Sequence, residues 1–308
     1  MLPQSLVLKL YQPDIDWNKI DSDVKNYLNS NDYGITTEKR NPKIIVSLTS
    51  YPARIPRIHY TIISLLQQSV KPDEIILWLG KEQFPNKNND LPNELIKLIE
   101  HGLTIKYCKD IRSYKKLIPA LREYPEDVIV TSDDDVFYMN NWLEILLNSY
   151  KQNQTIIHCH RAHKIMFTSN GDLRSYNDWK GVIDYKDTTT SYINFMVGVG
   201  GVLYPPHTLH SDVTNESLFM KLSPSADDVW FWAMAVINEA KICVVKNNIT
   251  RTLPNIPLEY NDLVNPGGLC AINVIQCQND VQIKQVLKHY PQILEQIQTE
   301  TKQQQKVA

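Results

Sequence analysis

From Lys43 to Asn153 the sequence alternates between apolar segments rich in β-branched residues and segments whose apolar residues recur at helical spacing. The first kind predicts strands and the second predicts helices, with Pro56 near a helix start and Gly102 at a helix end. The predicted strands cover 43–50, 74–80, 103–108 and 127–132, and the predicted helices cover 56–69, 91–102, 115–124 and 140–153. Strands that alternate with helices in this way form a mostly parallel central sheet with helices on both faces, so we predict an α/β fold. Ligands of such sheets bind at the carboxyl ends of the strands.

Beyond Gln154 the pattern is less regular but continues. Strands are predicted at 155–160, 197–205 and 242–247, and helices at 225–240 and 279–290. We therefore predict one main domain over residues 43–250, flanked by an N-terminal extension over 1–42 and a C-terminal extension over 251–308.

The composition narrows the class of protein. Hydrophobic residues make up 43% and charged residues 21% of the 308 residues, and the net charge is -2, which is typical of a folded protein and argues against a nucleic-acid partner. The five cysteines are scattered without a Cys-x-x-Cys pair, which favours a reducing compartment over a disulfide framework or a zinc site. The N-terminus lacks the basic leader of a signal peptide, and no window reaches about 20 apolar residues. We expect a cytoplasmic protein with at most peripheral association at the inner face of the membrane.

Three consecutive carboxylates, Asp133 to Asp135, follow the fourth predicted strand in the stretch VIVTSDDDVFY. If the chain stays extended, Asp133 and Asp135 point to one side and Asp134 points to the other. Two converging carboxylates suit Mg2+ or Mn2+, which is commonly held by carboxylates together with substrate phosphates. The alternative is a solvated turn that caps the next element. The position at the ligand edge of an α/β sheet favours the metal site.

These features resemble glycosyltransferases of the GT-A fold, whose Asp-x-Asp motif lies at this strand end and binds a nucleotide sugar through a divalent metal. The resemblance covers about residues 43 to 247 and implies a Rossmann-like sheet with a nucleotide-binding half over 43–139 and an acceptor-binding half over 140–250. It implies that Asp135 binds the metal and that Asp133 shares the ion or contacts the ribose. Asp134 is implied to belong to the same donor site.

The loop after the first predicted strand, SLTSYPARI, lies where GT-A enzymes contact the nucleotide. Its hydroxyl groups, aromatic ring and guanidinium suit a ribose, a base and a phosphate. The residues expected to contact the donor are Thr49, Ser50, Tyr51 and Arg54. The family has an acidic residue after the third strand that contacts the base, which Asp110 matches. Lys115 and Lys116 are expected to neutralise the diphosphate. The alternatives are a turn shaped by its prolines, and lysines that are only solvated in the first turn of a helix.

The glycines of VGVGGVLYP (197–205) are not followed by a helix, which argues against a dinucleotide-binding loop. We expect Gly198, Gly200 and Gly201 to let the backbone approach a bound acceptor sugar. The alternative is a strand bulge.

The helix predicted at 225–240 begins with SADDVWFW. Taken alone, this is typical of a capped helix start, with Ser225 as the N-cap and Asp228 three residues later. The resemblance adds that inverting GT-A enzymes have an acidic motif at such a helix start, whose last Asp is the catalytic base. It implies Asp228 as the base and Asp227 beside the acceptor, although the first acid of the family is usually Glu, so the roles stay open between the two. Trp230 is expected to flank the acceptor, with a core position as the alternative.

The resemblance therefore implies a metal-dependent, inverting glycosyltransferase that moves a hexose-type sugar from a nucleotide diphosphate to a carbohydrate acceptor. We expect Mn2+ or Mg2+ as cofactor, a UDP-sugar as donor, and a carbohydrate or lipid-linked acceptor of bacterial polysaccharide or lipooligosaccharide assembly. One alternative is a nucleotidyltransferase, although SLTSYPARI lacks the glycines of the basic loop that such enzymes use. The other is a noncatalytic carbohydrate-binding protein or a degenerate transferase.

Overall fold

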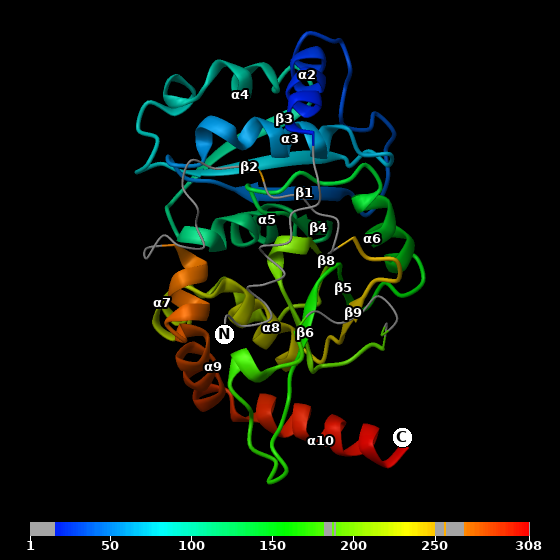
Figure 1. The fold of residues 1–308 in the computed structure, drawn as a ribbon, viewed down its shortest axis with the longest axis vertical. Helices are drawn as coiled ribbons and strands as arrows, with labels where there is room; N and C mark the ends of the chain where they lie inside the picture. Colours follow the sequence, from blue (N-terminus) through cyan, green and yellow to red (C-terminus); the bar gives the residue numbers. More distant parts are fainter. Residues whose placement is uncertain (1–15, 182–186, 188, 250–255, 257–267, 308) are drawn as a thin grey trace.

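A seven-stranded sheet forms the centre of the molecule in the computed structural model (Figure 1), which describes residues 16–181, 187, 189–249, 256 and 268–307. Its strands are β1 Ile44–Thr49, β2 Glu74–Gly80, β3 Leu103–Cys108, β4 Val128–Thr131, β5 Ile157–Cys159, β8 Val202–Tyr204 and β9 Ile242–Val244. They follow the order β3, β2, β1, β4, β8, β5, β9 across the sheet. A separate ribbon pairs β6 (Ala162–Lys164) with β7 (Asn194–Met196).

The directions of the strands place several strand ends at one edge. Strands β1 to β4 are parallel and β9 is parallel to β5, whereas β8 is antiparallel to both of its neighbours, β4 and β5. The carboxyl ends of β1, β4 and β5 therefore share one edge with the amino end of β8. This confirms the predicted α/β class with a mostly parallel sheet, and the three aspartates follow β4 at this edge.

Side chains of the strands alternate between two helix-covered faces. In β1, Ile45 belongs to the hydrophobic core on one face, and Val46 belongs to the core on the other. The helices on the Ile45 face are α5 Ile118–Glu123, α7 Glu216–Leu222, α8 Asp227–Ile237, α9 Gln278–His289 and α10 Pro291–Val307. The helices on the Val46 face are α2 Trp17–Leu28, α3 Ile58–Leu66, α4 Asn93–Lys97 and α6 Trp142–Tyr150. Figure 1 shows the two layers, with α2, α3 and α4 above the sheet and α5, α8 and α9 below it.

Short single-turn helices connect many of these elements. They are η1 Ile55–Arg57, η2 Lys87–Asp90, η3 Arg112–Lys116, η4 Tyr176–Asp178, η5 Gly198–Gly200, η6 Ser211–Thr214 and η7 Ala271–Ile275.

Helices near both ends of the chain contribute to the same cores. Val24 of α2 joins the core on its face, while Ile283 of α9 and Ile293 of α10 join the core around α8. The helix predicted at 279–290 is confirmed as α9, but α2 and α10 were not predicted, because their few apolar residues are separated by polar ones. The bounds of the main domain at 43–250 stay a prediction.

Several predicted elements differ in length or kind. The helix predicted at 91–102 is regular only over α4, although Gly102 does adopt the positive φ, 109°, of a helix-ending glycine. Pro119 does not interrupt a helix, since it lies in the first turn of α5, where its missing N–H has no partner to lose. The segment predicted as a strand at 197–205 forms the η5 turn followed by β8.

Gly201 lies where no side chain fits. Its φ is 92°, and an added Cβ would lie 2.5 Å from Cζ2 of Trp142. We expect Gly201→Ala to lower the free energy of unfolding by about 2–3 kcal/mol, measured by urea unfolding followed by circular dichroism. Gly171→Ala is the control, because Gly171 has a φ of 86° but no atom within 4 Å of an added Cβ. It should cost only about 1 kcal/mol. Equal losses in the two variants would show that the contact with Trp142 relaxes without cost.

Within the residues described above, no helix combines the length and the apolar character needed to cross a membrane.

Candidate functional site

Five segments meet at the edge where β1, β4 and β5 end. They are the loop after β1, η3 after β3, the loop after β4, the η5 turn before β8 and the start of α8. Hydrogen bonds and ion pairs join these segments through charged side chains, which is the arrangement expected at the ligand edge of an α/β sheet.

Asp134 anchors the loop after β4 to the loop after β1. Its carboxylate accepts hydrogen bonds from the hydroxyl of Ser50 and, at 2.6 Å, from the guanidinium of Arg54. The hydroxyl of Thr61 donates to the backbone carbonyl of Asp134 at 3.0 Å. Burial raises the pKa of Asp134, while the charge of Arg54 opposes that rise. Asp134 therefore holds the two loops together, and a fully solvated turn at this position is excluded.

The neighbours of Asp134 remain accessible. The side chains of Asp133 and Asp135 are 26% and 21% exposed, against 7% for Asp134. Strand alternation predicted that Asp134 would point away from Asp133 and Asp135. The structure separates them for another reason, because β4 ends at Thr131 and the chain turns at Asp134 and Asp135. The guanidinium of Arg54 also forms an ion pair with the carboxylate of Asp135, at 3.2 Å between Nη2 and Oδ2.

Lys116 connects the loop after β4 to the start of α8. Its ammonium lies 2.8 Å from Oδ1 of Asp133 and 3.1 Å from Oδ2 of Asp227, and its side chain is only 9% exposed. The next residue, Asp228, accepts the backbone N–H of Gly198 at 3.1 Å and 3.2 Å through its two carboxylate oxygens. We call Lys116 together with the carboxylates of Asp133, Asp227 and Asp228 the Lys116 cluster.

The absence of a side chain at Gly198 leaves space for the Lys116 cluster. A Cβ on Gly198 would lie 2.8 Å from Nζ of Lys116 and 3.0 Å from Oδ1 of Asp228. Both distances are shorter than normal contacts, so a larger residue would displace the charged groups. Of the glycines in VGVGGVLYP, Gly198 is therefore the one that faces the charged site.

The electrostatics of the cluster single out Asp228. Burial, followed by the charge of Asp227, raises the pKa of Asp228 to about 7, although Lys116 and the N–H of Gly198 lower it. Burial also disfavours the charge of Lys116, but the surrounding carboxylates more than offset this and hold its pKa well above the ordinary value. Asp228 is also partly accessible. The cluster thus combines a permanent cation with a reachable carboxyl that changes protonation near neutral pH, as a general base must.

The start of α8 differs from the predicted capped helix. Its N-cap is Ala226, no side chain caps it, and Asp227 and Asp228 are its first two residues. The hydroxyl of Ser225 instead donates to the side chain of Asn273 at 2.7 Å. The capping role considered for Asp228 is therefore wrong, and its carboxylate is turned to Gly198.

The residues predicted to contact the donor lie around the loop after β1. The hydroxyl of Thr49 donates to the carbonyl of Trp78 at 2.8 Å, and Ser50 and Arg54 are engaged with Asp134. Tyr51 is 38% exposed, with the guanidinium of Arg54 5.6 Å from the centre of its ring. Tyr51 thus has free surface for a ligand at this loop.

Asp110 and Lys115 are joined to each other. The ammonium of Lys115 donates to the carboxylate of Asp110, and their side chains are 3% and 27% exposed. The alternative of solvated lysines is therefore wrong, because both Lys115 and Lys116 are buried in η3. Asp110 keeps enough exposure to contact a ligand.

The predicted acceptor residues need correction. Trp230 is 0% exposed and donates its indole N–H to the carbonyl of Val213 at 3.1 Å, so it is a core residue and presents no ring face to a sugar. Gly201 packs on the ring of Trp142, and Gly200 packs on Arg161. These side chains fill the space in which a sugar was expected to approach the backbone.

One residue of the site, Arg161, received no role from the sequence. The available signal for Arg161 was its position as the single Arg or Lys in HCHRAH, a segment whose residues are all buried.

A metal site of three or more His, Cys, Asp or Glu side chains does not occur among the described residues. Asp133 and Asp135 are accessible oxygen ligands at the edge of the sheet, as a hard cation requires. The ring of His158 contacts the hydroxyl of Ser149 and the carbonyl of Asn153, so both of its nitrogens are engaged within the protein.

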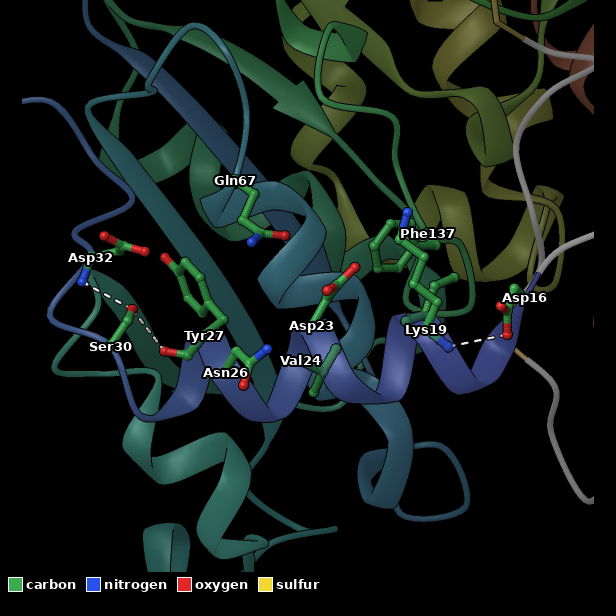
Figure 2. Close-up of a pocket in the computed structure, with 11 residues that line it drawn as sticks. Asp16, Lys19, Asp23, Val24, Asn26, Tyr27, Ser30, Asp32, Gln67 and Phe137 are labelled. Atoms are coloured by element: carbon green, nitrogen blue, oxygen red, sulfur yellow. Dashed lines mark hydrogen bonds between the residues drawn. The ribbon is translucent and has the colours of Figure 1, made fainter.

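A surface pocket beside α2 lies apart from these groups. Figure 2 shows Asp23 and Tyr27 of α2 lining it together with Gln67 and Phe137. None of the predicted site residues lines this pocket. The candidate site is therefore defined by the charged groups at the edge of the sheet.

Comparisons with known proteins give distant similarities. No family model matches the sequence. A curated protein of Vairimorpha ceranae (strain BRL01), described as a probable cytoplasmic lysine–tRNA ligase, is 26% identical over 121 residues, which cover 39% of this chain and 21% of that protein. The chain thus spans about a fifth of the length of the curated relative it matches.

Three solved structures are similar at low identity. A mannosyltransferase from Pyrobaculum calidifontis in complex with GDP-Man and Mn2+ has a TM-score of 0.48 at 12% identity, over 85% of this chain and 68% of that chain. A CMP:2-keto-3-deoxy-manno-octonic acid synthetase complexed with CTP has a TM-score of 0.40 at 10% identity, over 77% and 99%. A glucosyl-3-phosphoglycerate synthase from Mycobacterium tuberculosis, in complex with Mn2+, UDP and glucosyl-3-phosphoglycerate, has a TM-score of 0.30 at 14% identity, over 48% of each chain. Similarity at this level assigns neither family nor function, and the fold class rests on the strand order and directions above.

Proposed function

We propose that this chain is a metal-dependent glycosyltransferase in which Asp228 is the catalytic base. The observation that carries the proposal is the partly accessible carboxyl of Asp228, whose pKa is raised to about 7 beside the aspartates that follow β4. A base with this pKa is deprotonated in a large fraction of molecules at neutral pH. In the transfer, the acceptor oxygen bonds to the anomeric carbon, the bond from that carbon to the diphosphate breaks, and the acceptor's hydroxyl proton passes to Asp228.

The donor is proposed to bind at Asp133 and Asp135 with Mn2+ or Mg2+. Two accessible carboxylates fit such an ion, because it is commonly held by one or two carboxylates plus substrate phosphates. A bound ion would neutralise charge on the diphosphate. Lys116 and Arg54 already position these carboxylates and add positive charge on the side of the leaving group.

The nucleoside is proposed to lie over the loop after β1. The exposed ring of Tyr51 offers a stacking surface for the base. Asp110 is proposed to contact the base, with Lys115 holding its carboxylate, and Thr49 is proposed to line the ribose. Ser50 and Arg54 act through Asp134, which they hold between the two loops.

The finer assignments rest on the resemblance of the two acidic motifs. They are an inverting reaction, a hexose-type sugar from a UDP-sugar, a carbohydrate or lipid-linked acceptor, and a bacterial cytoplasmic enzyme of polysaccharide or lipooligosaccharide assembly. The arrangement of a metal-binding pair and a separate base supports a direct displacement at the anomeric carbon, because no second carboxylate is needed as a nucleophile.

One nucleoside diphosphate, tested among UDP, GDP, CDP and ADP with Mn2+, is expected to raise the melting temperature of the purified protein. At about 100 times its dissociation constant a ligand stabilises the folded state by about 2.7 kcal/mol. The shift should require the metal and disappear both with a chelator and in Asp135→Ala, because Asp135 is proposed to hold the ion.

Asp172→Ala is the matched control, since it removes an exposed carboxylate far along the chain from the motif. The control should keep the full shift. If no diphosphate raises the melting temperature of the wild type, a noncatalytic role becomes the favoured hypothesis. Stabilisation by a nucleoside triphosphate alone would favour a nucleotidyltransferase.

A further inference from the structure

Arg161 is a buried residue whose guanidinium has no partner among the described residues. The residue is 8% exposed, and within the described part of the chain it forms no hydrogen bond through its side chain and no ion pair. Its Nε is sealed from solvent. An arginine stays charged and has five N–H donors, so burial without acceptors is strongly unfavourable. Such a group fits a site whose acceptors arrive with a ligand.

The strand order places Arg161 on the acceptor side of the site. Arg161 follows β5, which is separated from β4 by β8 alone, so it lies about 10 Å from β4 along the sheet. The proposed nucleoside loop follows β1, on the opposite side of β4. The η5 turn, which holds Asp228 through Gly198, lies before β8, between β4 and β5. A group bound at Arg161 and the proposed nucleotide would thus lie on opposite sides of the proposed base.

The surroundings fix Arg161 beside the η5 turn, which also carries Gly198. Gly200 packs against it so closely that an added Cβ would lie 2.9 Å from the Cβ of Arg161. The carbonyl of Arg161 accepts the N–H of Val197 at 3.0 Å, which fixes its backbone beside the η5 turn. Tyr176 and Asp228 are the ionisable groups whose charges act most on the guanidinium.

The hydroxyl of Tyr176 is a second donor that no described residue accepts from. Its ring is held edge-on by Phe195 and His163, with centroid distances of 5.7 Å and 5.5 Å. Its hydroxyl makes no hydrogen bond to any residue of the described segments. A guanidinium and a hydroxyl, neither with an acceptor in the described part of the chain, therefore lie within electrostatic reach of each other and of the proposed base.

We propose that Arg161 and Tyr176 bind an anionic oxygen group, a phosphate or a carboxylate, carried by the acceptor. This inference rests on the proposed function, since it takes Asp228 as the base that selects the acceptor hydroxyl. The planar guanidinium matches two oxygens of either group, and the hydroxyl of Tyr176 donates to the same group. The acceptor is thus an acidic or phosphorylated sugar, and Arg161 screens its charge from the nearby carboxylates.

The stability of an Arg161→Met variant separates this role from a structural one. Methionine keeps much of the apolar stem and removes the unpaired charge, so the melting temperature of the free protein should rise by about 2 °C or more. If the guanidinium were instead a counter-charge required by Asp228 and Asp133, the variant would melt below the wild type. That result would overturn the proposal.

Binding is then measured by calorimetry, with Mn2+ and the stabilising nucleoside diphosphate present at saturation so that the donor site is filled. The probes are inorganic phosphate, glucose 6-phosphate, glucuronate and glucose. We expect at least one anionic probe to bind, at least 10-fold more weakly in Arg161→Met, and glucose not to bind. Phosphate and carboxylate acceptors are distinguished by which sugar binds more tightly.

Arg122→Met is the control, because Arg122 is an exposed arginine that donates to the carbonyl of Thr214. It should leave the affinities unchanged. Equal affinities in wild type and Arg161→Met, or no anion binding in the wild type, would overturn the anion site. Anion binding that depends on Arg161 in a protein without any nucleoside diphosphate response would instead overturn the glycosyltransferase proposal and leave the anion site standing.

Discussion

Asp228→Asn is expected to lower kcat for sugar transfer by about 10³-fold, with the dissociation constant of the nucleoside diphosphate unchanged. Asparagine keeps the shape of the side chain and an oxygen for the N–H of Gly198, but it does not accept the proton of the acceptor hydroxyl. Initial rates of transfer and calorimetry of the nucleoside diphosphate with Mn2+ measure the two quantities. Full turnover in a purified Asp228→Asn variant would remove Asp228 as the base.

The pH dependence of kcat/KM is a second test of Asp228 as the base. A base works in its deprotonated form, so kcat/KM should rise about tenfold per pH unit on the acid side and level off above the pKa of Asp228, which is about 7. After burial, the charge of Asp227 is the main cause that raises this pKa. Asp227→Asn should therefore move the acid limb to lower pH and reduce kcat far less than Asp228→Asn. The opposite order of losses would assign the base to Asp227.

The sequence predicted the part of the fold that depends on local pattern. β-branched apolar runs such as IIVSLT and EIILWLG form β1 and β2, since apolar segments of this length that alternate with helices fit the interior of a parallel sheet. The acidic motif was placed correctly at the end of β4 for the same reason. What the pattern does not contain is the direction of β8, because an antiparallel strand after a long connection has no local signature.

The site was harder to predict because its chemistry arises from contacts between distant segments. Trp230 was expected beside a ligand, but tertiary packing buries all sides of α8 around it. The sequence left Lys116 either at the diphosphate or in solvent. Its burial follows from the position of η3 against β1, where the hydroxyl of Ser47 donates to its carbonyl at 2.6 Å. Asp228 is distinguished from Asp227 by the N–H of Gly198, 30 residues earlier in the chain. Residue type and spacing alone carry no information on such contacts.

Lys116→Met is expected to lower the free energy of unfolding by about 3–5 kcal/mol, measured by urea unfolding at neutral pH. The reason is that Lys116 is the cation shared by the Lys116 cluster. Its removal leaves Asp227, whose side chain is only 10% exposed, without its cation and close to two other carboxylates. Breaking a buried ion pair by removing one partner costs more than the pair contributes, because the remaining charge stays buried.

Lys115→Met is the matched control, since it removes the adjacent lysine, which is also buried but has one carboxylate partner that is 27% exposed. Water can solvate that partner, so the loss should be about 1–2 kcal/mol. A loss in Lys116→Met no larger than in Lys115→Met would show that the cluster does not depend on its shared cation.

The Lys116→Met variant also tests the electrostatics of the proposed base, because Lys116 lowers the pKa of Asp228. In the folded fraction of Lys116→Met, the acid limb of kcat/KM should move to higher pH. Asp227→Asn should move the same limb to lower pH. Shifts of the two variants in the same direction would contradict the assignment of that limb to Asp228.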